Sequence, residues 1–248
     1  MRLSPMNEPR LLPAGDSALV VEYGDRIDPA INRRVRELFL AIEQARVHGV
    51  VDLVPTYRSL LVYYDPLSLT LGELKDRLLD LDARRGDLQL APPQVIDIPT
   101  VYGGEFGPDL GFVAGHNGLT EQEVIDIHTG TDYLVYMMGF SPGFPYLGGM
   151  SERIAAPRLK TPRTAIPAGS VGIAQQQTGI YPVESPGGWQ LIGRTPVRLF
   201  DPDRRPPVLV EAGDYLRFVP INEAAFAEVD AAVTRGTWSL TRREKRDD

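Results

Sequence analysis

The sequence predicts an α+β protein, with a small ferredoxin-like domain of the split β-α-β type followed by a mainly-β barrel domain. Two observations support this prediction. Over roughly the first ninety residues, strand-like runs alternate with amphipathic helical repeats. Further along the chain, Gly and Pro separate short apolar or alternating runs, as in closed or nearly closed β-barrels. We therefore place the domains at 1–90 and 91–240, with a mobile tail over 241–248.

The first helix of the small domain has a clear beginning. A strand is predicted at 17–24. Asp28 and Pro29 then start a helix, with Asp28 as the N-cap and Pro29 in the first turn. Apolar residues follow at helical spacing over 31–42, with Arg and Glu between them. This pattern predicts a helix that buries one face.

The rest of the small domain is expected to complete an antiparallel sheet with two helices on one face. Two more strands are predicted at 49–55 and 59–66, and the capping box formed by Thr70 and Glu73 begins a second amphipathic helix. The run QVIDIP, at 94–99, is expected to return as the fourth strand. The resulting order, β-α-β-β-α-β, is that of the ferredoxin-like arrangement.

The barrel domain follows a polar, proline-ended linker that is predicted at 83–94. A short helix is expected within 118–130, after a second capping box. Strands are expected in the runs DYLVYMM, SVGIAQQQ, GWQLIGRT, PVRLF, VLVEAG and YLRFVP. A last helix over 222–234 carries three apolar residues at core spacing, which are Phe226, Val229 and Val233.

Composition excludes several classes of protein. The net charge of -7 and the pI of about 5.1 argue against a broad nucleic-acid-binding surface. The chain has no cysteine, which excludes disulfides, thiolate catalysis and zinc–cysteine sites. The N-terminus lacks the apolar core of a signal peptide, and no apolar run approaches the roughly 20 residues that span a bilayer. We expect a cytoplasmic protein that binds neither nucleic acid nor membrane.

The stretch GFSPGFPYLGG, at 139–149, contains the G-x-S-x-G pattern of a serine-hydrolase nucleophile elbow. In such an elbow, the backbone N–H of the residue after the serine helps to form the oxyanion hole. Here that residue is Pro142, which has no N–H, and the residues that follow disfavour the helix that an elbow needs. We therefore interpret Ser141 as a turn residue.

Common nucleotide and metal motifs are missing from the sequence. It contains no G-x-x-x-x-G-K-[ST] loop, and its three histidines form no H-E-x-x-H or close ligand pair, so no metal site is predicted. His128, after a predicted helix, is compatible with general acid–base catalysis and equally with a structural role at a helix C-terminus. Asp109 is compatible with orienting His128 or with capping a turn.

A second unusual region, at 157–195, is rich in Gly, Pro and Arg. Arg158, Arg163 and Arg194 are candidates for convergence on an anion, because a guanidinium presents a planar fork that suits carboxylate or phosphate. Surface ion pairing is the alternative for all three, and spacing alone favours it.

Three further features of this region allow either a ligand-binding or a structural role. Gly169 and Ser170 either expose backbone N–H groups to an anion or form an ordinary turn. Trp189 either stacks on a ligand or packs as a core or rim residue. Gln177, with the two glutamines before it, either presents amides to a ligand or belongs to an exposed strand face.

Taken together, these strings resemble the B subunit of bacterial ATP-dependent 5-oxoprolinase. Four segments carry the resemblance, in this order within about residues 139–202: GFSPGFPYLGG, PRLKTPRTAIPAGSVGIA, QTGIYPVESPGGW and IGRTPVRLFDP. The family includes the sporulation-kinase inhibitor KipI and the domain called allophanate hydrolase subunit 1. Related sequence occurs in urea carboxylase.

The resemblance implies a cyclophilin-like β-barrel from about residue 95 onward, with a smaller α/β domain before it. It also implies a hetero-oligomer with a homologue of the C subunit and with a separate A subunit, which together hydrolyse 5-oxo-L-proline to L-glutamate with ATP as co-substrate. A phosphorylated amide intermediate is expected, since a plain lactam is a poor electrophile. The alternatives are KipI-like inhibition of a sensor histidine kinase and a role in allophanate or urea metabolism.

Positions that match the family define the candidate site. The catalytic candidate is His128. The candidates for binding substrate or an anion are Arg158, Arg163, Arg194, Gly169, Ser170 and Gln177. The candidate walls of a pocket or of a partner-facing surface are Phe140, Phe144, Tyr146, Tyr181 and Trp189.

Overall fold

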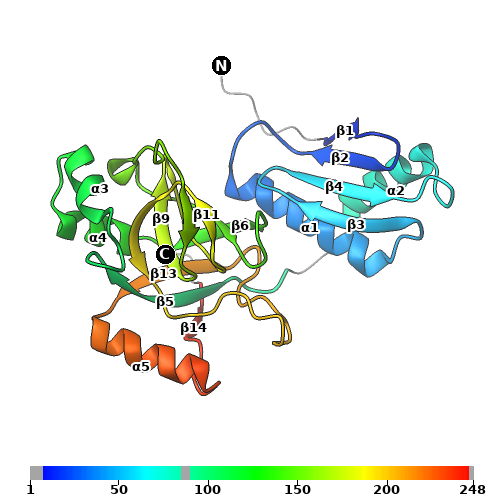
Figure 1. Cartoon of the computed structure of the whole chain (residues 1–248). Coiled ribbons are helices and arrows are strands. Elements are labelled where there is room, and N and C mark those ends of the chain that lie inside the picture. Colours follow the sequence, from blue (N-terminus) through cyan, green and yellow to red (C-terminus); the bar gives the residue numbers. More distant parts are fainter. Residues whose placement is uncertain (1–7, 85–89, 246–248) are drawn as a thin grey trace. The chain divides into compact units, whose positions relative to one another are not determined.

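The computed structural model describes residues 8–84 and 90–245 (Figure 1). The chain forms two compact units, Met1–Ala91 and Pro92–Asp248. Part of the predicted linker, at 85–89, and the last three residues of the predicted tail lie outside the described residues. Within the described ranges, no helix is long and apolar enough to cross a membrane.

The first unit is a four-stranded antiparallel sheet with two helices. Its elements are β1 (Arg10–Pro13), β2 (Ala18–Glu22), α1 (Pro29–Ala45), β3 (Val50–Pro55), β4 (Ser59–Tyr64) and α2 (Leu71–Arg84). The strand order is β1-β2-β4-β3, and every neighbouring pair is antiparallel. Because β2 and β3 both run antiparallel to the β4 strand between them, β2, α1 and β3 form a split β-α-β unit.

Both helices of the first unit begin where the sequence predicts. The Asp28 carboxylate accepts hydrogen bonds from two N–H groups in the first turn of α1, at 2.8 and 3.3 Å. At the start of α2, the Thr70 N–H donates to the Glu73 carboxylate at 2.9 Å, and the Glu73 N–H donates to the Thr70 hydroxyl at 3.3 Å. Each cap satisfies N–H groups that the helix itself leaves unpaired.

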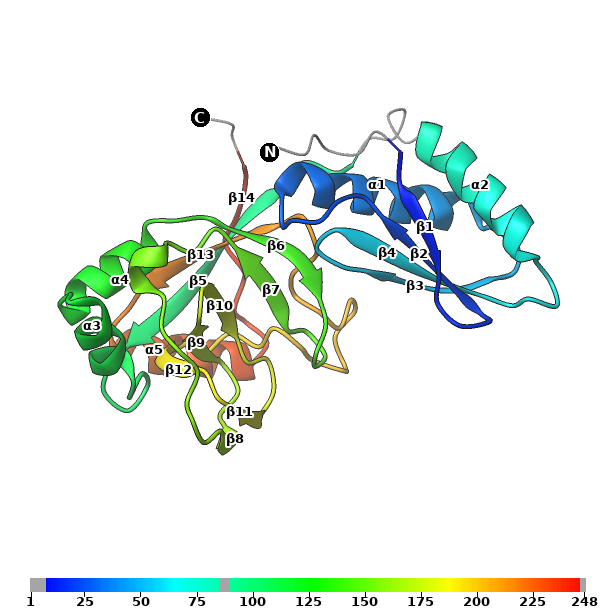
Figure 2. The same ribbon diagram turned by 90° about the horizontal axis from the view of Figure 1, so that it is seen from above.

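The two helices lie on one face of the sheet (Figure 2), where their apolar stripes meet the inward side chains of the strands. The buried core of the unit consists of Leu19, Val21, Tyr23, Ile31, Val35, Leu38, Ile42, Leu60, Val62, Tyr64, Leu74 and Leu78. Burial of a single large apolar side chain stabilises a fold by about 1.5–3 kcal/mol. The apolar spacing of α1 and α2 therefore decides which helix faces contact the sheet.

The fourth strand of this sheet is not the predicted one. QVIDIP, at 94–99, belongs to the second unit, and β1 takes the edge position, with Leu11 paired to Val21 of β2. An alternating run shows that a strand has a buried face, but it does not show which sheet the strand joins. The β1 strand has four residues and ends in a proline, so its local signal is weak. The predicted order was wrong, and the observed order is β-β-α-β-β-α.

The second unit is built around a nearly closed β-barrel, which confirms the predicted barrel class. The barrel strands are β5 (Gln94–Tyr102), β6 (Tyr133–Met138), β7 (Pro145–Gly148), β9 (Ser170–Ala174), β10 (Gln177–Ile180), β12 (Gln190–Arg194) and β13 (Tyr215–Pro220). They lie in the order β10-β9-β12-β5-β13-β6-β7, and the two end strands, β10 and β7, pack against each other. A separate two-stranded sheet consists of β8 (Arg163–Ile166) and β11 (Ser185–Gly187).

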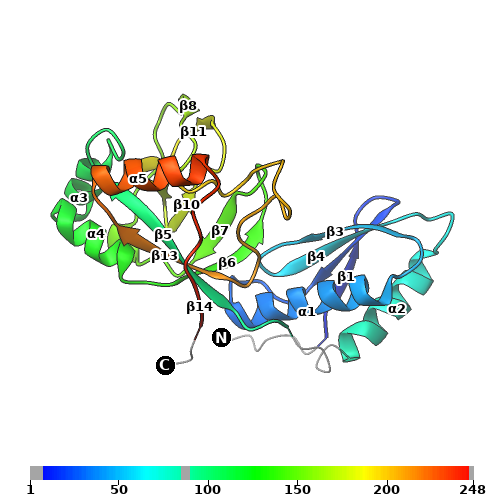
Figure 3. The same ribbon diagram turned by 90° about the horizontal axis from the view of Figure 1, so that it is seen from below.

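Helices cover the barrel of the second unit from two directions (Figure 3). The helices α3 (Leu110–Asn117) and α4 (Glu121–Thr129) pack against each other, on β12 and β13 respectively. The last helix, α5 (Glu223–Thr234), packs on β5. It forms as predicted, yet its expected core residues Phe226, Val229 and Val233 are only partly buried. A helix on the outer side of a barrel has one neighbour, so its apolar stripe is covered on one side only.

The end of the described chain is a strand and not a mobile tail. The β14 strand (Arg242–Glu244) pairs antiparallel with β5. Arg243 forms an ion pair with Asp97, and the Lys245 ammonium lies 3.2 Å from the Asp132 carboxylate. The prediction of a mobile tail was wrong for these residues. The segment has little apolar content, and backbone pairing with ion pairs holds it in place.

A matched pair of leucines on α2 tests the packing of the first unit. Leu78 is 1% exposed and its neighbour Leu79 is 43% exposed. We expect Leu78→Ala to lower the free energy of unfolding by about 2–5 kcal/mol, because it removes transfer energy and leaves a cavity. Leu79→Ala should change it by less than about 1 kcal/mol. Urea denaturation followed by circular dichroism measures both, and equal losses would contradict the packing described.

Candidate functional site

One pocket in the second unit brings together seven of the candidate residues. It has a volume of about 190 Å³. Its lining residues are Phe140, Phe144, Tyr146, Arg158, Gln177, Tyr181, Pro186, Gly187, Gly188 and Trp189. One side of the pocket comes from β7 and the loop before it, and the other side comes from β10, β11 and the turn that leads to β12.

Three buried aromatic rings form the base of this pocket. The ring centroids of Phe144 and Trp189 lie 5.8 Å apart at 88°, and those of Tyr181 and Trp189 lie 6.2 Å apart at 78°. Edge-to-face packing sets the positive edge of one ring against the negative face of the next. Gly179 allows the rings to approach the barrel wall, because a Cβ there would lie 3.1 Å from both Phe144 and Trp189.

Phe140 lies at the open edge of the same aromatic group. It is 71% exposed, and its ring centroid lies 5.7 Å from that of Phe144 at 77°. Its backbone φ is 63°, in the left-handed region that residues other than glycine rarely adopt. Its strain and exposure beside a pocket make Phe140 a candidate for contact with a ligand or a partner protein.

Arg158 combines a fixed backbone with a guanidinium that has no partner among the described residues. The amide Nε2 of Gln190 donates to the Pro157 carbonyl at 2.8 Å, and the Leu159 N–H donates to the Gly188 carbonyl at 2.7 Å. The side chain of Arg158 is exposed and, within the described parts of the chain, forms no hydrogen bond or ion pair. A positioned cation of this kind suits a carboxylate or another small anion.

Arg163, in contrast, already has an anionic partner. Its Nη2 lies 2.8 Å from Oδ1 of Asp109, and its Nη1 donates to the Trp189 carbonyl at 3.3 Å. The other Asp109 oxygen accepts a hydrogen bond from the Leu191 N–H at 2.6 Å. Asp109 therefore neither orients His128 nor caps α3 through its side chain. It joins the start of β8 to β12 and fixes the backbone that carries Trp189.

The turn at Gly169 and Ser170 lies with Arg194, outside the lining of the pocket. Both backbone N–H groups of the turn donate to nearby carbonyl oxygens, at 2.7 and 3.2 Å, so neither is available to an anion. Arg194 Nε donates to the Ala168 carbonyl at 3.0 Å. A Cβ at residue 169, where φ is 82°, would collide with the Thr195 carbonyl oxygen, so the turn requires glycine. Of the three candidate arginines, Arg158 lines the pocket, whereas Arg163 pairs with Asp109 and Arg194 bonds to the Ala168 carbonyl.

His128 lies in the core of the second unit and not in the pocket. It is fully buried, with Nδ1 2.7 Å from the Tyr102 hydroxyl and Nε2 2.8 Å from Thr178 Oγ1. The Thr178 hydroxyl donates its one proton to the Gly172 carbonyl, which assigns the imidazole proton to Nε2. Burial lowers the pKa of His128 to about 3. This geometry supports a structural role for the histidine and gives no support to the expected catalytic one.

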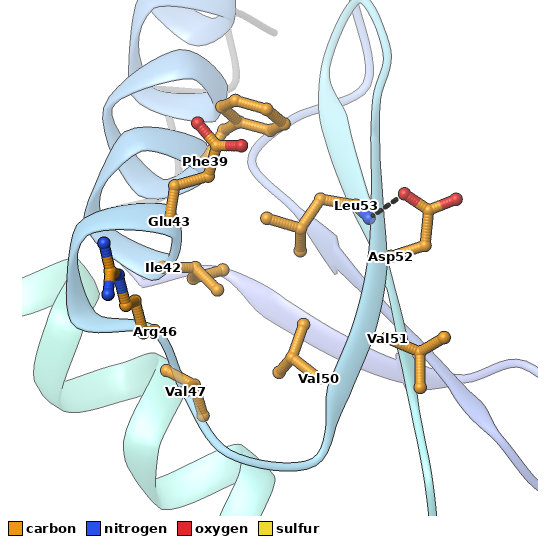
Figure 4. Close-up of a pocket in the computed structure, with 9 residues that line it drawn as sticks. All are labelled: Phe39, Ile42, Glu43, Arg46, Val47, Val50, Val51, Asp52 and Leu53. Atoms are coloured by element: carbon orange, nitrogen blue, oxygen red, sulfur yellow. Dashed lines mark hydrogen bonds between the residues drawn. The ribbon is translucent and has the colours of Figure 1, made fainter.

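Two larger cavities lie in the first unit. One, of about 390 Å³, lies between the end of α1 and the edge strand β3 (Figure 4). Its lining is mostly apolar, with Glu43 on α1 and Arg46 at the end of α1, and the Asp52 carboxylate points away from α1 and accepts a hydrogen bond from the Leu53 N–H. The other, of about 330 Å³, has cations and anions mixed in its lining. The smaller aromatic pocket is the better candidate, because its polar and aromatic groups converge.

The aromatic pocket is suited to a small, flat anion. It offers rigid ring edges and the guanidinium of Arg158, which has no partner among the described residues. Within the described parts of the chain, no group of three or more His, Asp or Glu side chains could hold a metal ion. Fold and pocket together define a protein with a small α/β unit and a nearly closed barrel that carries a candidate small-molecule site.

Comparison with known proteins gives the family. Residues 9–210 match the family described as carboxyltransferase domain, subdomain C and D. The chain is 46% identical over 223 residues to the 5-oxoprolinase B subunit of Bacillus subtilis, covering 84% of this chain and 91% of that protein. It is 41% identical over 221 residues to the 5-oxoprolinase B subunit of Escherichia coli O157:H7, covering 88% and 99%. The chain belongs to the family of 5-oxoprolinase B subunits, as the sequence resemblance implied.

A solved structure supports the fold. The urea amidolyase of K. lactis superposes with a TM-score of 0.76, and the match covers 96% of this chain and 16% of that larger one. The two are 22% identical, so the likeness concerns the fold alone.

Sequence reasoning missed the partners that decide the role of each polar candidate. Asp109 and Arg163 are 54 residues apart, and Thr178 lies 50 residues after His128. No local pattern connects such positions, because only the closed barrel brings them together.

The stability of the protein should fall in acid through His128. The folded state holds the pKa of this imidazole at about 3, whereas the unfolded chain protonates near 6.5. The stabilisation is therefore complete above about pH 6.5 and is lost as the pH falls, by up to about 1.4 kcal/mol per pH unit from this group. We expect His128→Gln to flatten the pH dependence of unfolding between about pH 6 and 4. Imidazole NMR of the wild-type protein gives a second measurement, and protonation of His128 near pH 6 would contradict the prediction.

The Asp109 carboxylate should be a stability determinant of the second unit. We expect Asp109→Ala to lower the free energy of unfolding by about 1.5–3 kcal/mol, because it leaves Arg163 and the Leu191 N–H without their acceptor. The matched control Asp230→Ala removes an exposed carboxylate on α5 and should cost less than about 0.5 kcal/mol. Urea denaturation measures both, and equal effects would show that the ion pair does not hold the pocket together.

Proposed function

We propose that this chain is the B subunit of an ATP-dependent 5-oxoprolinase, which acts with a homologue of the C subunit and with a separate A subunit to hydrolyse 5-oxo-L-proline to L-glutamate. The observation that carries the proposal is 41–46% identity, over most of the chain, to three bacterial proteins named as B subunits of 5-oxoprolinase. Similarity of this extent covers both units of the protein and not one motif. The word subunit in those names supports a chain that acts inside a larger assembly.

The chemistry of lactam hydrolysis explains the need for ATP. A lactam is a planar, resonance-stabilised amide, so its carbonyl carbon is a poor electrophile. Transfer of the γ-phosphoryl group of ATP to the lactam oxygen converts that oxygen into a leaving group. Addition of one water then breaks the C–N bond, and a second water releases phosphate to give glutamate, ADP and phosphate.

Within that assembly we assign to this chain the binding of a small anion in the aromatic pocket, and to another member of the complex the binding of ATP. A triphosphate is usually held by a glycine-rich loop or by several cations. The pocket presents Arg158 alone, and the Gly169 turn uses its N–H groups internally. In this proposal the barrel is of the cyclophilin-like type, and no prolyl isomerase activity follows from that fold.

A protein-binding regulator is the second candidate, in the form of a KipI-like inhibitor of a sensor histidine kinase. The exposed Phe140 supports it, because exposed aromatic side chains are typical of protein contact surfaces. Unchanged autophosphorylation of candidate kinases in the presence of the chain would exclude this role. A role in urea metabolism has weaker support, since the urea carboxylase and urea amidolyase relatives are 25–26% identical.

Reconstitution tests the main proposal. We expect this chain, mixed with its C-subunit and A-subunit partners, ATP and 5-oxo-L-proline, to release glutamate and ADP together. Each component omitted in turn, this chain included, should abolish release, because no single polypeptide holds the whole reaction. Glutamate is measured by an enzyme-coupled assay. A fully assembled mixture that leaves 5-oxoproline intact would overturn the proposal.

A further inference from the structure

We infer that the aromatic pocket is the binding site for 5-oxoproline, with Arg158 as the partner of its carboxylate and its ring held between Phe140 and Trp189. The inference rests on the proposed function and adds the place of binding and the role of each side chain.

The charge of the pocket favours a ligand that carries a single carboxylate. Burial raises the pKa of Tyr181, and the positive charges of both Arg158 and Arg163 oppose that rise, so both guanidinium groups lie within electrostatic reach of the pocket. The charge of Arg163 is offset by Asp109, 2.8 Å away. Arg158 has no such partner in the described chain. One net positive charge therefore faces the pocket, and a monocarboxylate matches it.

The backbone around Arg158 is already in place for binding. Hydrogen bonds hold the residues on both of its sides, and one of the acceptors, the Gly188 carbonyl, belongs to the lining of the pocket. A ligand therefore has to order a single side chain and not a loop. This lowers the entropy cost of forming a two-pronged guanidinium–carboxylate pair.

The aromatic rings select a flat and compact molecule. The three buried rings hold one another edge to face, so they cannot spread around a bulky ligand without loss of packing. Drug-sized ligands occupy pockets of about 300–1,000 Å³, whereas this pocket measures about 190 Å³. A five-membered lactam with one carboxylate is of the size that fits. Gln177 lines the same space.

The same distribution of charge disfavours the product. Glutamate carries an ammonium group and two carboxylates. Its ammonium would approach the Arg158 guanidinium, and its second carboxylate would lose water beside aromatic rings with no second cation to pair with it. The pocket therefore favours the closed ring over the opened chain.

Phe140 gives a way to separate binding from folding. Its ring lies at the open edge of the pocket, while its backbone φ of 63° is a conformation that glycine adopts freely. Phe140→Gly removes the ring and relieves the backbone strain in one step, so it tests the ring in a protein that still folds.

Substrate saturation of the reconstituted complex tests the inference. We expect Arg158→Gln to raise the KM for 5-oxoproline by about 10- to 100-fold and to leave the KM for ATP unchanged, because the lost interaction is a charge-assisted hydrogen bond. Phe140→Gly should raise the same KM by a smaller factor. The matched control Arg153→Gln removes an exposed arginine outside the pocket lining, and it should change neither KM.

Direct binding distinguishes this inference from the proposed function. Calorimetry on the purified complex should show binding of 5-oxoproline, at least tenfold weaker binding of L-glutamate and of 2-pyrrolidinone, which lacks the carboxylate, and no competition by ATP. An active complex whose KM for 5-oxoproline is unchanged by Arg158→Gln overturns the inference and leaves the function intact. An inactive complex that binds 5-oxoproline through Arg158 overturns the function and leaves the pocket assignment intact. A wild-type complex that binds no 5-oxoproline overturns the inference.

Discussion

The carboxylate of Asp109 is the group on which the geometry of the pocket depends most. One oxygen accepts a hydrogen bond from the backbone of β12, and the other pairs with the guanidinium at the start of β8, which in turn reaches the Trp189 carbonyl. Three segments far apart in the chain are thus held by one side chain. An exposed ion pair contributes little to stability. This pair differs because it is partly buried and because its hydrogen bonds anchor backbone beneath the aromatic rings.

Three arginines of one short region illustrate how much about a binding site can be predicted from the sequence. Arg158, Arg163 and Arg194 are alike in the sequence, each beside a proline or a glycine. In the structure, one has a carboxylate partner, one bonds to a carbonyl in a turn, and one has no partner in the described chain. Residue type made all three candidates for binding an anion or for ion pairing. Only tertiary contacts decide which cation remains for a ligand.

The parts of the fold that could be predicted are those with local causes. The capping residues Asp28 and Thr70 start their helices as expected, because a cap depends on three or four neighbouring residues. The strand at 94–99 was recognised as a strand but assigned to the wrong sheet, and β14 was missed, because pairing depends on distant partners. The aromatic lining was predicted as a set through family resemblance. The complete burial of His128 was not predicted, since burial depends on the whole barrel.

Because the barrel is not fully closed, it can widen more easily at the pocket than elsewhere. Its lining comes from both sides of the line where β7 meets β10, and across that line the described residues show packing but no ladder of backbone hydrogen bonds. Elsewhere, widening the barrel would break such a ladder, whereas widening it here loosens side-chain contacts only. The pocket thus lies where the barrel strands separate most easily. A molecule bound there contacts both strand edges and restrains their separation, so the barrel becomes more rigid as the pocket is filled.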